Sequence, residues 1–390
     1  MALGMTTHEI TVLGAGIGGL TAAIALAGRG ARVRVIEQAT VLSEVGAGIQ
    51  ISHNAMVVLE RLGLADRLRA VAVRSEGTLL VNYSDGAPVL PVAPPEIGPT
   101  WYVHRADLIA LLAEAAEAQG VVLELGRKVV ALKPEADSTV LQFDAGQEHR
   151  AGLLIAADGV RGPGRKALES ASQPRFSGQV AWRAVVPWSR GMGDGRARLA
   201  MGPGRHVVTY PLRHGTLMNL VAVEERNDGI SESWSASGDP AELKARFAGF
   251  GGEAGAVISQ VKDVKLWSLS LHPVATRWWR HRLALLGDAA HPTLPFMAQG
   301  ACLAIEDAYV LAEELSTGGD DALARYQARR LDRATRVVEL AGRNSWRFHL
   351  RAPWRQIAHT LLRIAGQRAA PRIDWVYTHD VTRDLSASEK

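Results

Sequence analysis

The chain has 390 residues, a formal net charge of +4, 47% hydrophobic and 22% charged residues, and a single cysteine. This length exceeds what one hydrophobic core usually supports and predicts two joined domains, while the scattered arginines and the lack of a long apolar run exclude a nucleic-acid-binding stripe and a transmembrane segment. Because Cys302 has no partner for a disulfide and Met1–His8 lacks a signal-peptide pattern, the sequence predicts a cytoplasmic protein.

The first element in chain order is a predicted βαβ unit. Ile10–Leu13 is a short β-branched run typical of a buried parallel strand, and a glycine-rich turn leads from it into an alanine-rich helix over Leu20–Gly28. A second apolar strand follows at Val33–Ile36. This order of strand, turn, helix and strand is the fingerprint of a dinucleotide-binding unit.

The turn supplies the glycines that a bound pyrophosphate requires. Gly14 permits the tight turn, Gly16 lets the backbone approach the phosphates, and Gly19 lets helix and strand pack closely. Glu37 lies 18 residues after Gly19 at the end of the second strand, where a carboxylate binds a ribose hydroxyl pair. We therefore expect a bound dinucleotide, and the fingerprint alone fits either NAD or FAD.

Extended segments follow. Residues 75–99 contain five prolines and are predicted to be extended rather than helical. Leu153–Ala156 has the pattern of a buried strand, and an Asp-Gly pair, Asp158 and Gly159, comes just after it. As at Glu37, a polar residue thus follows the end of a buried strand.

Residues 176–235 have the pattern of an antiparallel sheet. They hold short runs rich in valine, tryptophan and tyrosine, such as Val180–Pro187 and Val207–Leu212, separated by glycine-containing turns. His206 lies four residues before Tyr210, and because side chains alternate along a strand, both are expected to project from one face. We expect this sheet to form a wall of a substrate pocket.

A third strand-end motif lies late in the chain. Arg282–Leu286 is an apolar strand followed by Gly287 and Asp288, and a proline-bearing loop then leads through Pro295 to Gln299. Helical patterns follow over 301–315 and over 321–347, where an amphipathic helix is expected to cover the nucleotide-binding domain. A shorter helical pattern near 357–362 precedes the polar tail.

These three motifs, in this order and at these separations, resemble the class A, single-component, FAD-dependent aromatic hydroxylases over nearly the whole chain. Within that family the chain looks most like the group acting on salicylate, 3-hydroxybenzoate and 6-hydroxynicotinate. The segments on which the resemblance depends are Gly46–Ile49, His104–Leu108, His206–Leu212 and Pro295–Ala308.

The resemblance implies an α/β fold. We expect a Rossmann-type, GR2-like FAD-binding domain, an interleaved antiparallel β-sheet substrate domain and C-terminal helices. The expected boundaries are 1–74, 100–175 and 276–320 for the discontinuous FAD-binding domain, 75–99 and 176–275 for the substrate domain, and 321–390 for the C-terminal helical segment.

The resemblance also implies FAD as cofactor and assigns residues to it. Gly48 and Arg105 are expected to contact FAD, and Asp158 with Gly159 to lie near the cofactor phosphates, although Asp158 also fits a residue that caps the turn. Asp288 is expected to accept a hydrogen bond from a ribityl hydroxyl, with a helix N-cap as its alternative role.

The loop before the late helix is expected to face the flavin. Gln299 and Gly300 open that helix, so their N–H groups and the positive end of its dipole should face the pyrimidine edge and stabilise the anionic reduced flavin. Pro295 and Phe296 should face the reacting edge. Some relatives have a polar residue at one of these two positions and this chain has none, which weakens the transfer of a specific substrate.

The implied activity is hydroxylation of a small aromatic acid or phenol by molecular oxygen through a flavin hydroperoxide, with NADH or NADPH as reductant. Deprotonation of a phenol raises the nucleophilicity of its ring, and a histidine that titrates near neutral pH is a natural base. His206 resembles the residue credited with substrate activation in hydroxybenzoate-type relatives, and Tyr210 is expected to hydrogen-bond the substrate. A pocket-edge histidine and a buried wall tyrosine are the alternatives.

Other activities of the same fold stay open, namely hydroxylation of a ubiquinone-precursor ring or another flavin-dependent oxidation or reduction. Gln50 stands where a hydroxynicotinate-type relative has a histidine, which counts against that activity. The sequence leaves open the choice between NADH and NADPH, the exact substrate, and whether the protein forms a homodimer.

Overall fold

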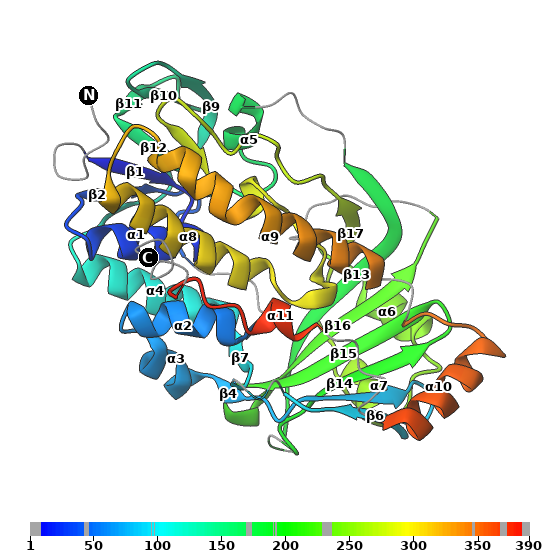
Figure 1. Cartoon of the computed structure of the whole chain (residues 1–390). Coiled ribbons are helices and arrows are strands. Elements are labelled where there is room, and N and C mark those ends of the chain that lie inside the picture. Colours follow the sequence, from blue (N-terminus) through cyan, green and yellow to red (C-terminus); the bar gives the residue numbers. More distant parts are fainter. Residues whose placement is uncertain are drawn as a thin grey trace.

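In the computed structural model the described residues are 9–42, 47–94, 96, 98–168, 174–189, 191, 193–227, 236–344, 348–366 and 373–383. Met1–His8, Gly46 and residues 345–347, to which some sequence expectations refer, lie outside the described residues. Figure 1 shows a helix-covered sheet at one end of the molecule and a large antiparallel sheet at the other. The expected α/β fold is confirmed.

A mostly parallel sheet of six strands forms the first part of the fold. Its order is β18-β19-β12-β1-β2-β8, and every neighbouring pair is parallel except β18 and β19. The carboxyl ends of β1, β2, β12 and β19 therefore meet at one edge, where open α/β sheets bind ligands. The strands are β1 (Ile10–Leu13), β2 (Val33–Ile36), β8 (Val122–Glu124), β12 (Leu153–Ala156), β18 (Trp279–Arg280) and β19 (Leu283–Leu285).

Helices pack against this sheet and complete its core. Helix α1 lies against α4 and α8, and α8 lies between α1 and α9 (Figure 1). Helix α2 also packs on α8, and α5 packs on β9 of a small three-stranded sheet, β11-β10-β9. The bounds are α1 (Ile17–Ala27), α2 (His53–Arg61), α3 (Ala65–Val71), α4 (Arg105–Ala118), α5 (Pro163–Leu168), α8 (Gly300–Thr317), α9 (Ala322–Asn344), β9 (Val129–Pro134), β10 (Thr139–Phe143) and β11 (Glu148–Ala151).

Helix α1 begins at Ile17, earlier than the Leu20 that the alanine-rich pattern predicts. A Cβ on Gly18 would stand 2.6 Å from a methyl carbon of Leu286, and one on Gly19 would stand 2.0 Å from the carbonyl oxygen of Gly14. The two glycines are helical because this close packing outweighs their low helix propensity.

The second large sheet has seven strands in the order β17-β13-β16-β15-β14-β5-β6. Its pairs are antiparallel except for β14 and β5, which are parallel. Residues 75–99 contribute β5 and β6, as the expected extended segments. The strands are β5 (Thr78–Asn82), β6 (Pro88–Val92), β13 (Arg175–Pro187), β14 (Ala197–Gly202), β15 (Arg205–Leu212), β16 (Leu217–Glu225) and β17 (Lys265–Leu271).

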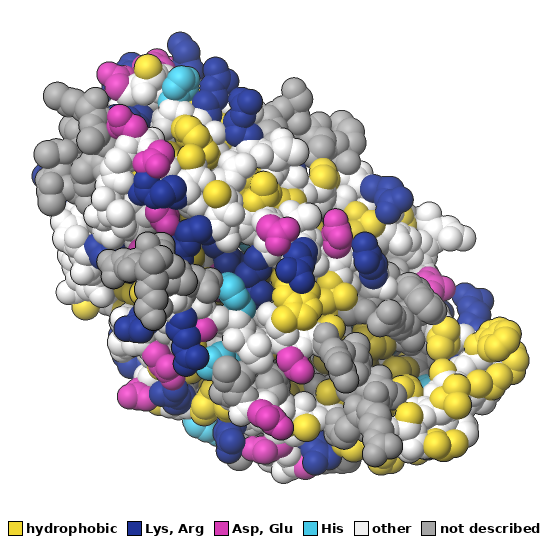
Figure 2. Space-filling model, in the orientation of Figure 1, with side chains coloured by type: hydrophobic (Ala, Val, Ile, Leu, Met, Phe, Trp, Pro, Cys, Tyr) yellow, Lys and Arg dark blue, Asp and Glu magenta, His cyan; other side chains and the backbone are white. Residues whose placement is uncertain are grey.

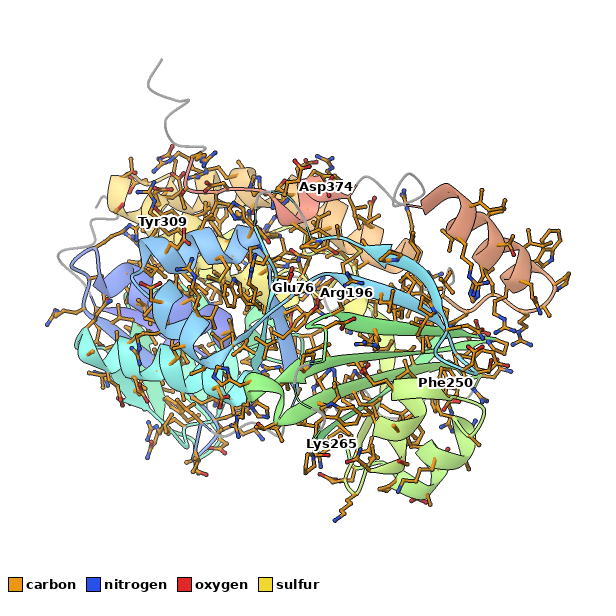
Figure 3. All side chains as sticks on the ribbon, turned by 90° about the horizontal axis from the view of Figure 1, so that it is seen from below. Glu76, Arg196, Phe250, Lys265, Tyr309 and Asp374 are labelled. Carbon is orange, nitrogen blue, oxygen red and sulfur yellow. The ribbon has the colours of Figure 1, made fainter. Side chains whose placement is uncertain are left out.

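Alternation along these strands gives the sheet two different faces. Trp182, Val207 and Leu220 belong to a buried cluster with Leu243 of helix α6 (Pro240–Arg246) and Val257 of helix α7 (Gly252–Ser259). Figure 3 shows these helices together on one side of the sheet. Neighbouring residues on each strand must then face the opposite side. A small sheet, β3-β7-β4, contacts α4 and α8 of the first part of the fold and β15 of the large antiparallel sheet. It consists of β3 (Gly48–Ile51), β4 (Val73–Arg74) and β7 (Trp101–His104).

The C-terminal elements contact both parts of the fold. Helix α9 packs on α8, α10 (Trp354–Ala365) packs on β6, and α11 (Asp374–Tyr377) packs on α2. The outer face of α10 exposes Trp354, Ile357, Leu361 and Ile364, which form the hydrophobic tip in Figure 2. Among the described residues, no helix combines the length and apolar character that a membrane span requires.

Candidate active site

A cavity of about 2200 Å³ extends from the glycine-rich turn after β1 to the free face of the seven-stranded sheet. Pockets for one small molecule usually have volumes of about 300–1,000 Å³, so this cavity has room for a dinucleotide and a second, smaller ligand. It brings together all fourteen residues expected at the site except Gly19, which instead packs against Gly14.

The glycine-rich turn has the geometry expected for phosphate binding. Gly14 has a φ of 102°, and a Cβ there would stand 2.5 Å from the carbonyl oxygen of Ala157. A Cβ on Gly16, by contrast, would meet nothing within 4 Å, so this glycine leaves open space beside the first turn of α1. The first N–H groups of a helix have no partner within the helix and attract anions. The turn therefore fits a pyrophosphate.

Glu37 accepts backbone hydrogen bonds beside this turn. One oxygen of its carboxylate accepts a hydrogen bond of 2.8 Å from the backbone N–H of Ala15, and the other accepts one of 2.8 Å from that of Ala39. Each carboxylate oxygen has two lone pairs, so Glu37 retains acceptor capacity toward the cavity that it lines. Its position therefore suits a carboxylate that binds ribose hydroxyls.

Asp158 follows β12 and caps the turn after it. Its Oδ2 accepts a hydrogen bond of 2.7 Å from the backbone N–H of Gly164, the alternative that the sequence left open. Burial raises the pKa of Asp158 to about 6, against the lowering effect of that hydrogen bond. Its Oδ1 is buried without a partner among the described residues, and the side chain lines the cavity beside Gly159. An orphaned buried oxygen here fits a cavity that receives a polar ligand.

Asp288 lies after β19 at the same edge of the sheet. Gly287 before it has a φ of 63°, which turns the chain sharply into the cavity. The side chain of Asp288 is exposed to the cavity that it lines, and its pKa is raised, chiefly by desolvation, although His291 and Arg105 lower it. Arg105, the first residue of α4, lines the same cavity. Asp288, as a hydrogen-bond acceptor, and Arg105, as a cation, together fit the binding of a polyol chain.

The N-terminus of α8 opens onto the middle of the cavity. The loop before it contains a 3-10 turn, Pro295–Met297, and Ala298 with a φ of 51°. The side chain of Gln299 turns away from the cavity: it donates to Ser52 Oγ and accepts from Asn54 Nδ2, both at 3.0 Å. Gln299 and Gly300 both line the cavity. The helix end therefore points its N–H groups where the sequence predicts a flavin edge.

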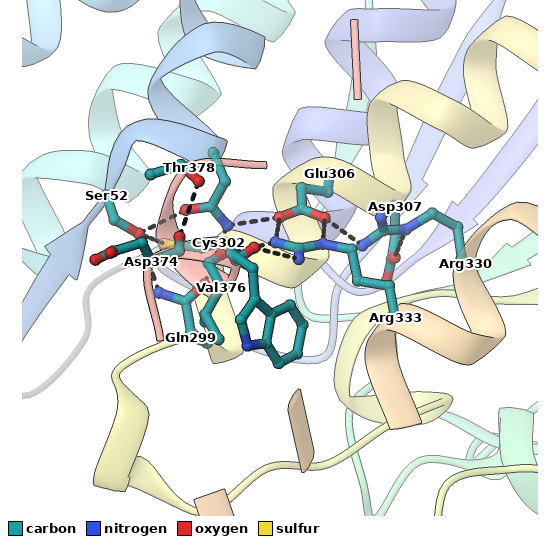
Figure 4. A network of polar contacts seen from close by, with 12 residues as sticks. Ser52, Gln299, Cys302, Glu306, Asp307, Arg330, Arg333, Asp374, Val376 and Thr378 are labelled. Atoms are coloured by element: carbon teal, nitrogen blue, oxygen red, sulfur yellow. Dashed lines mark hydrogen bonds and ion pairs between the residues drawn. The ribbon is translucent and has the colours of Figure 1, made fainter. Parts of the chain in front are cut away.

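A buried ion network anchors α8 behind this helix end (Figure 4). Glu306 forms ion pairs of 2.7 Å with Arg330 and Arg333 of α9, and Arg330 also pairs with Asp307 at 2.7 Å. His291 contacts the other oxygen of Asp307 at 2.5 Å. The position of the cavity-facing helix end thus depends on charges that lie outside the cavity.

The free face of the large sheet forms the far wall of the cavity. His206 and Tyr210 both lie on it, as the strand alternation predicts, and both are buried. Burial raises the pKa of the Tyr210 phenol, an effect that Arg183 opposes. Gly48 lies directly opposite, where a Cβ would stand 2.6 Å from the Tyr210 ring. Pro295, in the loop before α8, completes this wall.

One residue of the wall was missed by sequence reasoning. Arg183 lines the cavity with its guanidinium over the ring of Trp267, 5.3 Å from the ring centre. Trp182 faces the helices α6 and α7. Because side chains alternate along a strand, the next residue, Arg183, faces the cavity. The alternation of side chains is visible in the sequence, but its interpretation requires knowing which face of the strand the helices cover.

His349 was also missed. It lies between α9 and α10, and its Nε2 is 2.7 Å from Nδ1 of His206. The two histidines are 143 positions apart in the sequence, and no local pattern relates them.

Comparison with known proteins identifies related chains. Residues 7–341 match a family model described as FAD binding domain. The chain is 37% identical over 357 residues to 3-amino-4-hydroxybenzoate 2-monooxygenase of Streptomyces cremeus, with 88% of each chain covered, and 34% identical over 394 residues to 3-hydroxybenzoate 6-hydroxylase of Polaromonas naphthalenivorans, with 97% of each chain covered. A solved salicylate hydroxylase substrate complex is similar in fold, with a TM-score of 0.79, 25% identity and 97% of each chain covered.

Proposed function

This chain belongs to the FAD binding domain family, and from that premise we propose that the protein is an FAD-dependent monooxygenase that hydroxylates a small aromatic acid or phenol. The observation that supports this function best is the continuity of the cavity from the glycine-rich turn to a wall with a histidine, a tyrosine and an arginine. The relatives named for hydroxybenzoate hydroxylation point to the same substrate class.

The residues at the strand ends would hold the cofactor. We assign the pyrophosphate to the turn at Gly16, the ribose to Glu37, the ribityl chain to Asp288 and Arg105, and the flavin edge to the N-terminus of α8. Bound FAD would supply the activation of molecular oxygen with electrons from NADH or NADPH. A single buried thiol, Cys302, and this use of nicotinamide reductant fit a cytoplasmic site of action.

His206 is the proposed base for the substrate hydroxyl. Burial, together with the neighbouring His349, lowers the pKa of His206 well below its usual value, so its ring is neutral near pH 7. Nδ1 is bonded to His349, which leaves Nε2 for a ligand in the cavity. Accepting the phenol proton there would raise the electron density of the ring that is to be hydroxylated.

Arg183 and Tyr210 are the proposed groups that orient the substrate. Because burial raises the pKa of Tyr210, its hydroxyl stays protonated and can donate a hydrogen bond. Arg183 offers a planar, permanently charged fork that suits a carboxylate. An aromatic acid held by these groups would lie with its hydroxyl toward His206 and its ring beneath the apolar loop at Pro295 and Phe296.

The test is oxygenation of a defined set of compounds by the FAD-loaded protein. NADH and NADPH oxidation would be followed with 3-amino-4-hydroxybenzoate, 3-hydroxybenzoate, salicylate, 6-hydroxynicotinate and an apolar phenol. We expect at least one hydroxybenzoate to stimulate oxidation and to gain the mass of one oxygen atom. A product from the apolar phenol alone would favour ubiquinone-precursor hydroxylation, and no product from any compound would refute the monooxygenase assignment even if FAD binds.

A further inference from the structure

A chain of hydrogen bonds connects His206 to the protein surface. Nδ1 of His206 lies 2.7 Å from Nε2 of His349, and Nδ1 of His349 lies 3.1 Å from Oε1 of Glu225. The side chain of His349 is 1% exposed, whereas that of Glu225 is 41% exposed. The three groups therefore form a continuous path from the cavity to solvent.

The surrounding backbone holds this path in place. The N–H of Gly204 donates to the carbonyl oxygen of His349, and the N–H of Glu225 donates to that of Gly204, both at 3.0 Å. The amide nitrogen of Gln179 lies 3.3 Å from Nδ1 of His349. The segment that bears His349 is thus tied to the turn between β14 and β15, next to His206.

The bonding pattern selects one arrangement of ring protons. Two groups lie near Nδ1 of His349, and the charged carboxylate of Glu225 at 3.1 Å is a closer and stronger partner than the amide of Gln179 at 3.3 Å, so Nδ1 bears a proton and Nε2 is an acceptor. Nδ1 of His206 must then donate, which leaves a bare lone pair on its Nε2. His206 has no further hydrogen-bond partner for that nitrogen among the described residues, and the ring lines the cavity. This is the tautomer that a base for a cavity ligand requires.

The surface end of this path is charged. Glu225 contacts His349 and is paired on its other oxygen with Arg351, at 3.3 Å. Aromatic rings of Phe296 and Phe348 lie 5.9 and 5.5 Å from the His206 ring. Burial lowers the pKa of both histidines, and Glu225 partly offsets this for His349. Both rings are therefore neutral near pH 7, which lets each accept one proton and pass on another.

We propose that His349 and Glu225 form a proton exit for His206, an inference that rests on the proposed hydroxylation of a phenol. The O–H bond of the phenol breaks as an N–H bond forms at Nε2 of His206. The Nδ1 proton of His206 moves to Nε2 of His349, whose own Nδ1 proton moves to Glu225 and then to water. The net change is phenol to phenolate plus a solvated proton, without an oxidant. The reverse passage reprotonates the product and restores both tautomers.

The direct test is the rate of proton release on substrate binding. FAD-loaded protein would be mixed with 3-amino-4-hydroxybenzoate in weak buffer containing a pH indicator, with no reductant present. We expect His349→Gln and Glu225→Gln to slow proton release by about tenfold or more, since general-base steps contribute about 10²–10⁴-fold, and added imidazole to restore part of the rate in His349→Gln. His359→Gln, which replaces a buried histidine outside the path, should release protons at the unaltered rate.

A second measurement needs no substrate. In FAD-loaded protein labelled with 15N-histidine, NMR titration should show His206 and His349 titrating as a coupled pair. Glu225→Gln should lower the pKa of His349, because it removes the carboxylate that raises it. Independent titration of the two rings together with an unchanged His349 pKa in Glu225→Gln would overturn the proton exit.

These results separate the two proposals. If the unaltered protein hydroxylates the probe but both path variants release protons at its rate, the proton exit is wrong and the monooxygenase stands. If binding releases a proton through this path and no compound is hydroxylated, the exit stands and the reaction was assigned wrongly.

Discussion

Arg183 has a position that suits recognition of a substrate anion. It extends from β13 into the cavity, stacked over Trp267, on the face that also presents His206 and Tyr210. A hydrogen-bonded ion pair in such a sheltered place contributes about 1.5–3 kcal/mol. The corresponding loss of affinity is about 10–100-fold.

We therefore expect Arg183→Met to raise the dissociation constant of 3-hydroxybenzoate by about 10–100-fold, with little effect on the same phenol without its carboxylate. Arg183→Lys retains the charge without the fork, so its loss should be smaller. The change in flavin fluorescence on titration measures both. An equal loss for the acid and the simple phenol would show that Arg183 only shapes the wall.

His206 and His349 should make folding stability depend on pH. Both have pKa values lowered by burial, so between those values and about 6.5 the unfolded chain binds protons that the folded protein does not. The free energy of unfolding must then fall as pH falls below about 6.5, by up to about 1.4 kcal/mol per pH unit for each histidine.

Urea unfolding at several pH values between 5 and 8 checks this. His206→Asn should reduce the slope of stability against pH in the acid range. His281→Asn, at an exposed position with a φ of 53° that asparagine tolerates, should leave the slope unchanged. An unaltered slope in His206→Asn would mean that folding does not lower the pKa of His206, which would contradict its desolvated position in the wall of the cavity.

At the scale of the element, α8 is positioned by charge as well as by packing. Burial alone would raise the pKa of Glu306, but Arg330 and Arg333 outweigh it and the pKa is lowered. The ion pairs join α8 to α9, and Asn54 of α2 donates to the same carboxylate. Removing one charge from a buried network typically costs about 3–5 kcal/mol.

Glu306→Gln should accordingly lower the free energy of unfolding by about 3–5 kcal/mol and weaken FAD binding, because the helix end facing the cavity is no longer held. Glu339→Gln is the matched control: it removes an exposed i,i+4 pair with Arg343, which contributes at most about 0.5 kcal/mol. Urea unfolding and FAD titration measure both effects. Comparable losses in the two variants would show that the buried network has no special role.

Elements whose pattern depends on residues close together in the sequence could be predicted from it. The strand, turn and helix at Gly14 to Gly19 follow from local periodicity and from glycines that a tight turn demands, and the edge formed by Asp158 and Asp288 follows from the rule that parallel strands end together. The pairing of His206 with His349 could not be predicted, because it depends on how the segment after α9 returns to the sheet.

The position of Arg183 could not be predicted from the sequence for a different reason. An arginine on a half-buried strand resembles a solvated surface residue until the covering element is known. Helices α6 and α7 cover the face that bears Trp182, so the other face becomes the wall of the cavity. The residue type was visible in the sequence, but its surroundings were not.

At the scale of the whole molecule, the cavity exists because two different sheets meet at one place. The parallel sheet supplies turns and strand ends suited to a dinucleotide, and the seven-stranded sheet supplies a half-apolar wall suited to a small aromatic acid. Gly48, on the small sheet that contacts both parts of the fold, permits the close approach to Tyr210 that joins the two regions. The proposed reaction needs both halves at once.

The most direct test of this arrangement is the fate of isotopically labelled oxygen. FAD-loaded protein would be supplied with 3-amino-4-hydroxybenzoate, NADH or NADPH, and 18O-labelled dioxygen, and the product would be weighed by mass spectrometry. We expect one labelled oxygen atom in the aromatic product for each reductant consumed. Recovery of the aromatic acid intact and unlabelled, with the reductant either not consumed or spent only on reducing dioxygen to hydrogen peroxide, would contradict a cavity built to bring flavin and aromatic ring together.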